Sequence, residues 1–520
     1  MKEKTSFKAI VIVVATVLML MGLNLPAYAS ITTTTNTKDI TVSGIEAGAK
    51  VSAYQLATVN YDYTADQPQA VPYTWNNNVK TWVDANYSAY SDPENFYKNV
   101  TSNSDEAKVF YSALSAAIKG GTVSLTAKTQ TATGTASYPV TDEKLTGSVT
   151  FTGCEMGTYL ILIENGYMVY TPSVINLTPE FDNTAKEWKL PDSMAVTVKA
   201  TKPQITKTVA DETKTKDNYS TKDTIPFTIV ADIPTYATGS LAKSYKISDA
   251  LSNGLTVDKA TIKVFGQKGL ATPVQLTETT NYTLTATGNT AFDVDLKYDQ
   301  IKNYDKVKVT YSAKLTAGAS TNVGGAGNSN TAILTYSNNP YDTTSSQIQE
   351  TSNKVFTYGA EITKTDKTTG GALKGAEFEL AIGAEKVYFV KTVDGVYYQA
   401  NQSDAGATTK LVVDDNGKLA LYGLDEGTYS LSETKAPDGY NKSTEAKTIT
   451  ITDANIDGAL DDEEGTTGIY KLTFPNAKGF QLPVTGGAGT VAFVAGGIVF
   501  VGLGILLLVI ANKKKNLQKQ

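Results

Sequence analysis

The sequence has no histidine and no arginine, and Cys154 is its single cysteine. Without histidine, the chain lacks the commonest general base and metal ligand of proteins. One cysteine excludes an intramolecular disulfide, on which many secreted proteins rely. All 46 basic residues are lysines, and the absence of arginine argues against bidentate phosphate recognition. Because the net charge is −6, we do not expect nucleic-acid binding.

Long hydrophobic runs are confined to the two ends of the chain. At the N-terminus, three lysines precede the apolar run Ala9–Leu23, and Ala27-Tyr28-Ala29 forms an A-x-A cleavage site. This order is typical of a secretory signal peptide, whereas the run is short for a transmembrane helix. We therefore expect residues 1–29 to be removed and the rest to be secreted.

The C-terminal run follows the pentapeptide Leu482-Pro483-Val484-Thr485-Gly486 and precedes Lys513-Lys514-Lys515. Val491–Ala511 is uncharged and about 20 residues long, enough to cross a bilayer core. The lysines after it are positive-inside stop signals, and Pro483 keeps the pentapeptide extended. Together these features resemble the cell-wall sorting signal of Gram-positive surface proteins.

That resemblance implies cleavage between Thr485 and Gly486 by a sortase, a cysteine transpeptidase. The enzyme would then join the Thr485 carbonyl to an amine on the cell wall or on another protein subunit. Residues 481–520 are accordingly interpreted as a sorting signal with a transmembrane segment and a basic tail. The alternative is an ordinary C-terminal anchor in which LPVTG is incidental.

Between the two signals, about 455 residues are enough for roughly three domains. Short alternating runs rich in Thr, Val, Ile and Tyr predict an all-β protein. Two strand openings, Ile205–Val209 (ITKTV) and Glu361–Asp366 (EITKTD), are alike and carry a central lysine, which indicates a repeated domain type. We predict a first module at residues 30–200, a second at 203–357 and a third at 358–480. In the first, Ser104 and Gly120-Gly121 delimit one short helix, Asp105–Lys119.

The third module holds the most specific internal motif, Tyr429 to Tyr440, which reads YSLSETKAPDGY. It resembles the E-box of Gram-positive pilins, and the opening KTD…GALKGAEFEL resembles the B-type domains of the collagen-adhesin family, which are immunoglobulin-like β-sandwiches. The resemblance implies a spontaneous isopeptide bond between Lys364 and Asn476, assisted by Glu433. The alternative is a partly exposed lysine–glutamate pair.

The residue types suit that chemistry. Tyr429, Leu431 and Glu433 alternate by two, so they share the face of the strand that we expect to be buried. Burial raises the pKa of a carboxyl group and lowers that of an amine. A neutral Lys364 could then attack the Asn476 carboxamide while a protonated acid polarises the carbonyl and relays protons as ammonia leaves.

The second module resembles the A-type partner domain of the same family. Lys207 lies in its first strand, Asp249 matches the assisting acid, and Asn330 opens the last strand pair. The resemblance implies a second cross-link, Lys207–Asn330. The alternative is that Asp249 starts a turn and Asn330 caps a strand. In the first module, Glu164 follows Tyr159 by five residues instead of four, so Ile163 takes the inward place and we expect no isopeptide bond.

The end of the first module resembles the pilin motif of backbone pilins, whose lysine receives the threonine carbonyl of the next subunit. Aligning Val196 with the second valine of that motif places Lys199 at the acceptor position. The motif's tyrosine and proline are absent, and Trp188 lies two residues before the position that the motif gives its tryptophan. Lys202, before Pro203, is the alternative acceptor, and both lysines could instead be solvated linker residues.

An acidic segment from Asp453 to Glu464 has the D-x-[DN]-x-[DN]-G-x5-E spacing of a calcium loop. Its flanks, Thr448–Thr452 and Ile469–Phe474, are expected to be strands, whereas an EF-hand requires helices. We therefore interpret it as an acidic loop between strands, and we expect neither metal nor cofactor.

These observations predict tandem immunoglobulin-like β-sandwiches, A-type then B-type, after an N-terminal β-rich domain with a short helix. The predicted function is that of a sortase-polymerised backbone (major) pilin at the cell surface, a structural protein and not an enzyme. The resemblance implies pilin-type and housekeeping sortases, identical subunits, accessory tip and base pilins, peptidoglycan and a host surface receptor as partners. The alternatives are a monomeric wall-anchored adhesin and an accessory pilin.

Overall fold

The computed structural model describes residues 31–32, 35–101, 104–134, 146–236, 240–322, 326–461, 467–479 and 488–517. These residues form two compact units. The first unit holds the described residues up to 217, with 224–314 and 328–354, and the second holds 218–223, most of 315–327 and the residues from 355 onward. The predicted signal peptide, the LPVTG pentapeptide and Glu464 lie outside the described residues.

The first module is built on two sheets. In one, the first strand, β1, lies between the antiparallel β5 and the parallel β11, so the beginning and the end of the module pair directly. The other has the order β3-β2-β6-β8, with β4 also paired to β2. Two small antiparallel pairs complete the set: the hairpin β9-β10, and β7-β12, whose strands are far apart in the chain. The strands are β1 (Thr37–Ile45), β2 (Lys50–Asp62), β3 (Gln67–Trp75), β4 (Ala127–Thr131), β5 (Gly147–Glu155), β6 (Gly157–Glu164), β7 (Val169–Tyr170), β8 (Ser173–Leu177), β9 (Glu180–Asp182), β10 (Glu187–Lys189), β11 (Met194–Thr197) and β12 (Ala200–Thr201).

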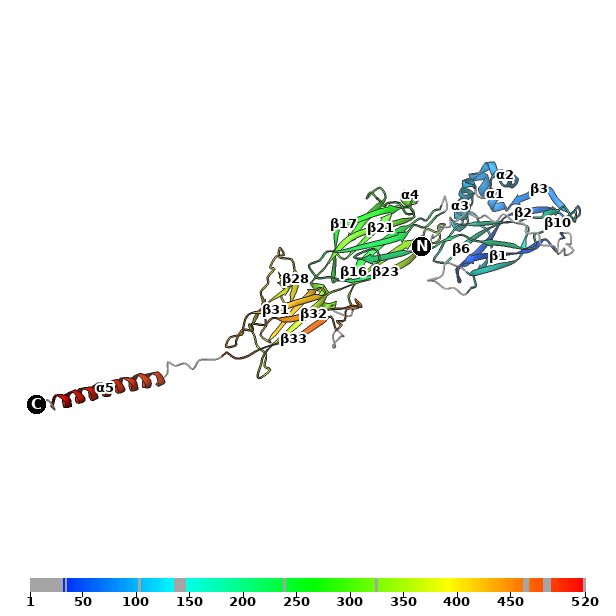
Figure 1. Ribbon diagram of the computed structural model, residues 1–520. Helices are drawn as coiled ribbons and strands as arrows, with labels where there is room; N and C mark the ends of the chain where they lie inside the picture. The colour runs from blue at the N-terminus through cyan, green and yellow to red at the C-terminus, as the bar shows by residue number, and fades with distance from the viewer. Residues whose placement is uncertain are drawn as a thin grey trace, which may run out of the picture. The chain divides into compact units, whose positions relative to one another are not determined.

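Helices cover part of the larger sheet in this module (Figure 1). The predicted helix is confirmed as α3 (Asp105–Lys119), N-capped by Ser104, with Phe110 and Leu114 fully buried. The sequence interpretation missed α1 (Asn77–Asn86), η1 (Ser88–Tyr90) and α2 (Pro93–Asn99). Each missed α-helix has a recognisable start, because the side chains of Asn76 and Asp92 accept hydrogen bonds from the first turn. Trp82 of α1 and Phe96 of α2 pack against Phe110 of α3.

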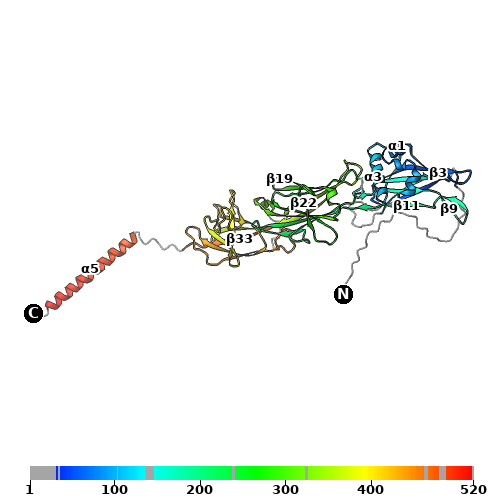
Figure 2. The same cartoon turned by 90° about the horizontal axis from the view of Figure 1, so that it is seen from above.

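The second module is a sandwich of two sheets with strand orders β13-β15-β21-β17-β18 and β14-β23-β22-β16-β20-β19 (Figure 2 labels β19 and β22). Strict alternation of buried and less buried residues along β13, β15, β21 and β22 places one face of each in the core. The strands are β13 (Ile205–Val209), β14 (Lys216–Asn218), β15 (Ile225–Asp232), β16 (Tyr245–Leu251), β17 (Leu255–Gln267), β18 (Val274–Gln275), β19 (Tyr282–Thr287), β20 (Ala291–Leu296), β21 (Lys306–Leu315), β22 (Asn328–Tyr336) and β23 (Gln347–Phe356), with α4 (Tyr298–Ile301) and η2 (Ala317–Asn322) between them.

The third module is also a two-sheet sandwich, with orders β27-β28-β30-β24-β33 and β26-β25-β31-β32, and β29 paired to β25. Its first strand, β24, runs parallel to its last strand, β33, with Lys364 opposite Phe474 and Asp366 opposite Asn476. The strands are β24 (Tyr358–Asp366), β25 (Glu377–Ile382), β26 (Glu385–Lys386), β27 (Tyr388–Lys391), β28 (Tyr397–Ala400), β29 (Leu411–Val412), β30 (Lys418–Leu424), β31 (Gly427–Lys435), β32 (Lys447–Ile451) and β33 (Ile469–Asn476). The prediction of a protein built mainly from β-strands is confirmed in all three modules, with helices added to the first.

The C-terminal hydrophobic run forms α5 (Ala488–Leu517). Val494–Ala511 is long and apolar enough to cross a membrane, with a mean hydropathy of 2.8. None of that segment is buried against the rest of the protein. Exposed Leu, Ile and Val on all sides of a helix are what a bilayer core requires.

Candidate cross-linking sites and sorting signal

In the third module, three side chains from three strands meet in the core. Lys364 comes from β24 and Asn476 from β33, the paired first and last strands, while Glu433 comes from β31 in the opposite sheet. Tyr429, Leu431 and Glu433 are all buried, as the alternation predicts. The side chains of Lys364 and Glu433 are completely shielded from solvent. The three predicted residues therefore share one dry site.

The contacts at this site orient the amide of Asn476. The Lys364 amine donates to the Asn476 side-chain oxygen and to the Phe474 carbonyl at 2.9 Å. The Asn476 nitrogen donates to both Glu433 oxygens, at 3.0 and 2.8 Å, and to the Asn441 carbonyl at 2.8 Å. The amine thus faces the carbonyl side of the amide, and the acid faces the nitrogen that would leave.

Electrostatics favour a reactive amine. Burial lowers the pKa of Lys364, although the nearby Glu433 carboxylate, with an oxygen 3.6 Å from the amine, opposes that effect. The amine also lies 5.0 Å from the centre of the Phe474 ring. A buried lysine with a lowered pKa releases its proton more readily, which nucleophilic attack requires.

The end of the E-box is tied to the first strand. The Tyr440 hydroxyl donates to Asp366 at 2.7 Å, and the amides of Thr368 and Thr369 donate to the other carboxylate oxygen. These hydrogen bonds, chiefly that of Tyr440, lower the pKa of Asp366 to about 2. The aspartate of the KTD opening therefore closes a turn beside Lys364, a role that the sequence interpretation did not assign.

The second module also brings its three predicted residues, Lys207, Asp249 and Asn330, together, but the sheets contribute them differently. Lys207 lies in β13, and Asp249 and Asn330 lie in β16 and β22 of the facing sheet. The Lys207 amine is 2.5 Å from Asp249 Oδ2 and 2.5 Å from Asn330 Oδ1. Asp249 sits within β16, so the alternative that it starts a turn is wrong.

Two aromatic residues complete this site, and the sequence interpretation missed both. The Tyr311 hydroxyl donates to Asp249 Oδ2 at 2.9 Å and accepts from Asn330 Nδ2 at 2.6 Å. The ring of Tyr311 stacks on Phe227, and the Lys207 amine lies 5.5 and 5.6 Å from the two ring centres. The inward alternation of β21 predicts that Tyr311 is buried, but its partners depend on strand pairing.

Burial sets the pKa values at this second site. It lowers the pKa of Lys207 to about 8, against the opposing attraction of Asp249. It also raises the pKa of Asp249, although the hydrogen bonds from Lys207 and Tyr311 act in the opposite direction. Both shifts favour the neutral amine and the protonated acid, the two forms that attack on an amide needs.

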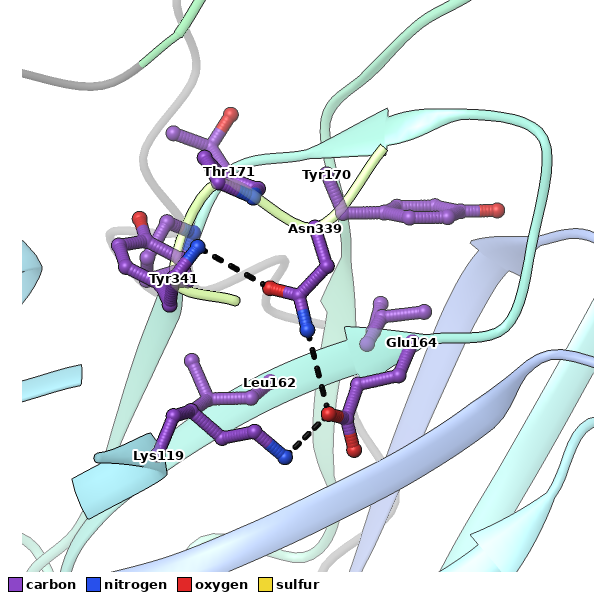
Figure 3. Close-up of a pocket in the computed structure, with 10 residues that line it drawn as sticks. Lys119, Leu162, Glu164, Tyr170, Thr171, Asn339 and Tyr341 are labelled. Atoms are coloured by element: carbon purple, nitrogen blue, oxygen red, sulfur yellow. Dashed lines mark hydrogen bonds and ion pairs between the residues drawn. The ribbon is translucent and has the colours of Figure 1, made fainter. Parts of the chain in front are cut away.

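In the first module, Glu164 lies at the boundary with the second module (Figure 3). Its carboxylate pairs with Lys119 and, at 3.7 Å, with Lys50, and it accepts a 3.2 Å hydrogen bond from Asn339. Ile163 is 8% exposed and belongs to the core, as the alternation predicts. Glu164 therefore joins two modules of the first unit. Two further hydrogen bonds act there, from Asn338 to the Gly166 carbonyl and from Tyr336 to the Tyr167 carbonyl.

The two candidate acceptor lysines lie at the end of the first module. Lys199 is partly buried between β11 and β12, and its carbonyl accepts a 3.2 Å hydrogen bond from Thr171. Its pKa is lowered by burial and by the positive charge of Lys108 on α3. Lys202, just beyond β12, is also partly buried. Lys199 is thus part of the folded edge of the first module, not of an extended linker.

The acidic segment of the third module is organised around Asp453, which is 1% exposed. Its carboxylate accepts hydrogen bonds from the Tyr358 hydroxyl at 2.9 Å and from the Gly458 and Asp457 amides. Strands β32 and β33 flank the segment, as predicted. Within the described residues, no three acidic side chains gather to form a metal site.

Comparisons with protein families support the interpretation of the C-terminal half. Residues 359–465 match the model of the SpaA prealbumin-like fold domain, and residues 475–516 match the LPXTG cell wall anchor motif. The first match lies within the third module and ends before β33, and the second covers most of the predicted sorting signal and of α5. The anchor motif supports attachment of this chain to the cell wall.

Two curated relatives are surface proteins of Gram-positive bacteria. The chain is 26% identical over 274 residues to the trypsin-resistant surface T6 protein of Streptococcus pyogenes serotype M6, covering 48% of this chain and 46% of that protein. It is 28% identical over 143 residues to the fimbrial subunit type 1 of Actinomyces viscosus, covering 27% and 24%. The chain thus aligns with less than half the length of either relative.

Solved structures show the same fold over most of the chain. The T6 backbone pilin of S. pyogenes matches with a TM-score of 0.61 and 18% identity, over 85% of this chain and 98% of that one. The full-length major pilin SpaD of Corynebacterium diphtheriae matches with a TM-score of 0.51 and 19% identity, over 87% and 100%. Together with the anchor motif, these findings support the resemblance to sortase-assembled backbone pilins.

Proposed function

We propose that the chain is the structural subunit of a covalently polymerised pilus that is anchored to the cell wall. The anchor motif at residues 475–516 and the pilin-like fold over most of the chain support this proposal. A sortase would cleave after Thr485 and join its carbonyl to the amine of Lys199 in the next subunit. Lys202 is the alternative acceptor.

The observation that carries the proposal is the pair of buried Lys–acid–Asn sites in one wall-anchored chain. A buried lysine facing an asparagine and an acid is costly if the three serve only as a polar cluster. Conversion to an amide removes the charge, so Lys364–Asn476 and Lys207–Asn330 are proposed as isopeptide cross-links. Glu433 and Asp249 would assist the two reactions.

Such cross-links suit a subunit that carries tension. Each would connect a first strand to a strand near the end of the same module, so force would pass along covalent bonds without unfolding the sandwich. The free energy of unfolding would also rise, because a closed loop restricts the unfolded chain. An ordinary surface enzyme has no comparable need for bonds that carry tension. We therefore propose that this chain has no enzymatic activity beyond its own cross-linking.

The partners follow from this assembly. A pilin-type sortase would polymerise identical subunits, a housekeeping sortase would attach the polymer to peptidoglycan, and accessory pilins would occupy its tip and base. The assembled fibre would support adhesion to a host surface receptor.

Boiled wall extracts test the proposal. Antibody against the chain should detect a ladder of very large species that survives detergent and heat, and the ladder should vanish when the pilin-type sortase is deleted. A single monomeric band in cells that retain their sortases would favour a monomeric wall-anchored adhesin.

A further inference from the structure

We propose that Tyr311 is a catalytic residue of the second module, and that its hydroxyl carries a proton from Asp249 to the leaving nitrogen of Asn330. This inference rests on the proposed Lys207–Asn330 cross-link. It adds a fourth reacting side chain to the lysine, acid and asparagine of that site.

The four side chains form a closed ring of hydrogen bonds. Lys207 Nζ contacts Asn330 Oδ1 and Asp249 Oδ2, each at 2.5 Å. Tyr311 Oη contacts the same Asp249 oxygen at 2.9 Å and Asn330 Nδ2 at 2.6 Å. The other Asp249 oxygen has no hydrogen-bond partner among the described residues. The acid therefore reaches the leaving nitrogen through Tyr311.

The reaction needs such a path. Asp249 first takes a proton from the Lys207 ammonium, and the neutral amine attacks Asn330 Cγ to form the new C–N bond. For the Cγ–Nδ2 bond to break, Nδ2 must gain a proton and depart as ammonia. Asp249 passes its proton to the Tyr311 oxygen while Tyr311 gives its own proton to Nδ2, and Asp249 then takes the second proton from Nζ. The products are a secondary amide, ammonia, a neutral acid and an unchanged tyrosine.

The third module provides the contrast. There, both Glu433 oxygens accept hydrogen bonds from Asn476 Nδ2 directly, at 3.0 and 2.8 Å. Glu433 Oε1 also lies 3.6 Å from the Lys364 amine. A glutamate, one methylene longer than an aspartate, spans amine and leaving nitrogen by itself. The shorter Asp249 does not, and Tyr311 fills the gap.

Burial and ring packing fix the Tyr311 side chain between Asp249 and Asn330. Tyr311 is 4% exposed. Its ring stacks on the ring of Phe227 with centres 5.3 Å apart, and the ring of Phe292 packs edge-on against it with centres 5.1 Å apart. Burial raises the pKa of Tyr311 well above its ordinary value, so the hydroxyl keeps its proton at neutral pH. A phenylalanine at this position preserves both ring contacts and removes the hydroxyl with its hydrogen bonds to Asp249 and Asn330.

The test follows cross-linking in time after cell-free synthesis of the full chain in detergent. Samples are quenched in acid, digested and analysed by mass spectrometry for the linked peptides of each module. In Tyr311→Phe, the Lys207–Asn330 link should form at least about 100-fold more slowly than in the wild type, because the loss of a general acid has an effect of that size. The Lys364–Asn476 link should form at the wild-type rate, which provides an internal control within each molecule.

Each outcome is decisive. Equal rates for wild type and Tyr311→Phe would overturn the relay, whereas the absence of the Lys207–Asn330 link in the wild type would overturn the proposed cross-link on which the relay rests. Circular dichroism in the near ultraviolet checks that the variant folds. If it does not, Tyr311→3-fluorotyrosine, nearly isosteric and more acidic, takes its place: an altered rate for this link alone supports the relay, and an unchanged rate contradicts it.

Discussion

The amine of Lys207 lies 2.5 Å from the side-chain oxygen of Asn330, although 123 residues separate the two in the chain. Lys207 belongs to one sheet of the second module and Asn330 to the other. A bond between them would therefore tie the two layers of the sandwich together. In the third module, Lys364 and Asn476 are 112 residues apart and also in contact, but they lie on paired strands of one sheet, so a bond there would tie the first strand to the last.

The first prediction concerns mass. Each cross-link releases one ammonia. The measured mass of the mature chain should therefore be about 34 Da below the mass calculated from its sequence, that is, about 17 Da for each bond. Lys207→Ala and Lys364→Ala should each restore about 17 Da, as measured by intact-mass spectrometry. Lys374→Ala, at a lysine that is 70% exposed, is the matched control and should leave the deficit unchanged. A wild-type mass equal to that of the mature sequence would refute both bonds.

The second prediction concerns stability. Glu433→Ala should prevent the Lys364–Asn476 bond. The free energy of unfolding of the third module should then fall by about 4–5 kcal/mol, by analogy with a disulfide that closes a loop of ~100 residues. Thermal unfolding followed by circular dichroism measures the loss. Glu445→Ala, at an exposed glutamate of the same module, should melt like the wild type. A variant that keeps its mass deficit would show that Glu433 is dispensable.

The third prediction concerns pH and uses Asn330→Ala, in which Lys207 stays a free amine. Burial lowers the pKa of Lys207 from 10.5 to about 8 in the folded state. Between these two values the unfolded chain binds more protons than the folded one, so the free energy of unfolding should rise with pH. The slope is at most about 1.4 kcal/mol per pH unit. Urea unfolding at pH 8 to 10.5 measures it.

The control for that experiment is the double variant Lys207→Met/Asn330→Ala, which lacks the buried amine. Its free energy of unfolding should rise less over the same pH range. If the two variants respond identically to pH, the Lys207 amine is not neutralised by burial.

The fourth prediction concerns calcium. The Asp453 carboxylate is already occupied by the Tyr358 hydroxyl and by backbone amides, so we expect the melting temperature to be the same with calcium and with a chelator. A bound ion would stabilise the folded state by mass action. An increase of several degrees with calcium, abolished by Asp457→Asn, would prove this interpretation wrong.

The resemblance to pilin domains supplied the lysine, acid and asparagine of both sites, and local sequence patterns added the expected burial. Alternation in β31 placed Glu433 on the buried face, and the lysines of the two ITKT openings, Lys207 and Lys364, marked the first strands β13 and β24. Tyr311 was missed because its contact with Asn330 arises from the pairing of β15 with β21 and from sheet-to-sheet packing, which no local pattern encodes. Helices α1 and α2 were missed because they are short, 10 and 7 residues, and carry few apolar positions, although Val79 and Val83 of α1 do have helical spacing.

The fifth prediction concerns the acceptor. The pKa of Lys199 is lowered by burial and by Lys108, which favours the neutral amine that nucleophilic attack requires. Lys199→Ala should abolish the ladder of boiled wall extracts and leave monomer on the wall, because wall anchoring uses only Thr485. Lys202→Ala is the control and should keep the ladder. The reverse result would identify Lys202 as the acceptor, and a ladder in the double variant would point to another lysine.

The most direct test of covalent assembly is the chemistry of the junction in the purified high-molecular-weight species. Tandem mass spectrometry of a digest should find one branched peptide in which the Thr485 carbonyl is bonded to Nζ of Lys199 of another subunit. If Thr485 were found joined only to cell-wall peptide, with no species larger than the monomer in cells that retain their sortases, the pilus account would be contradicted.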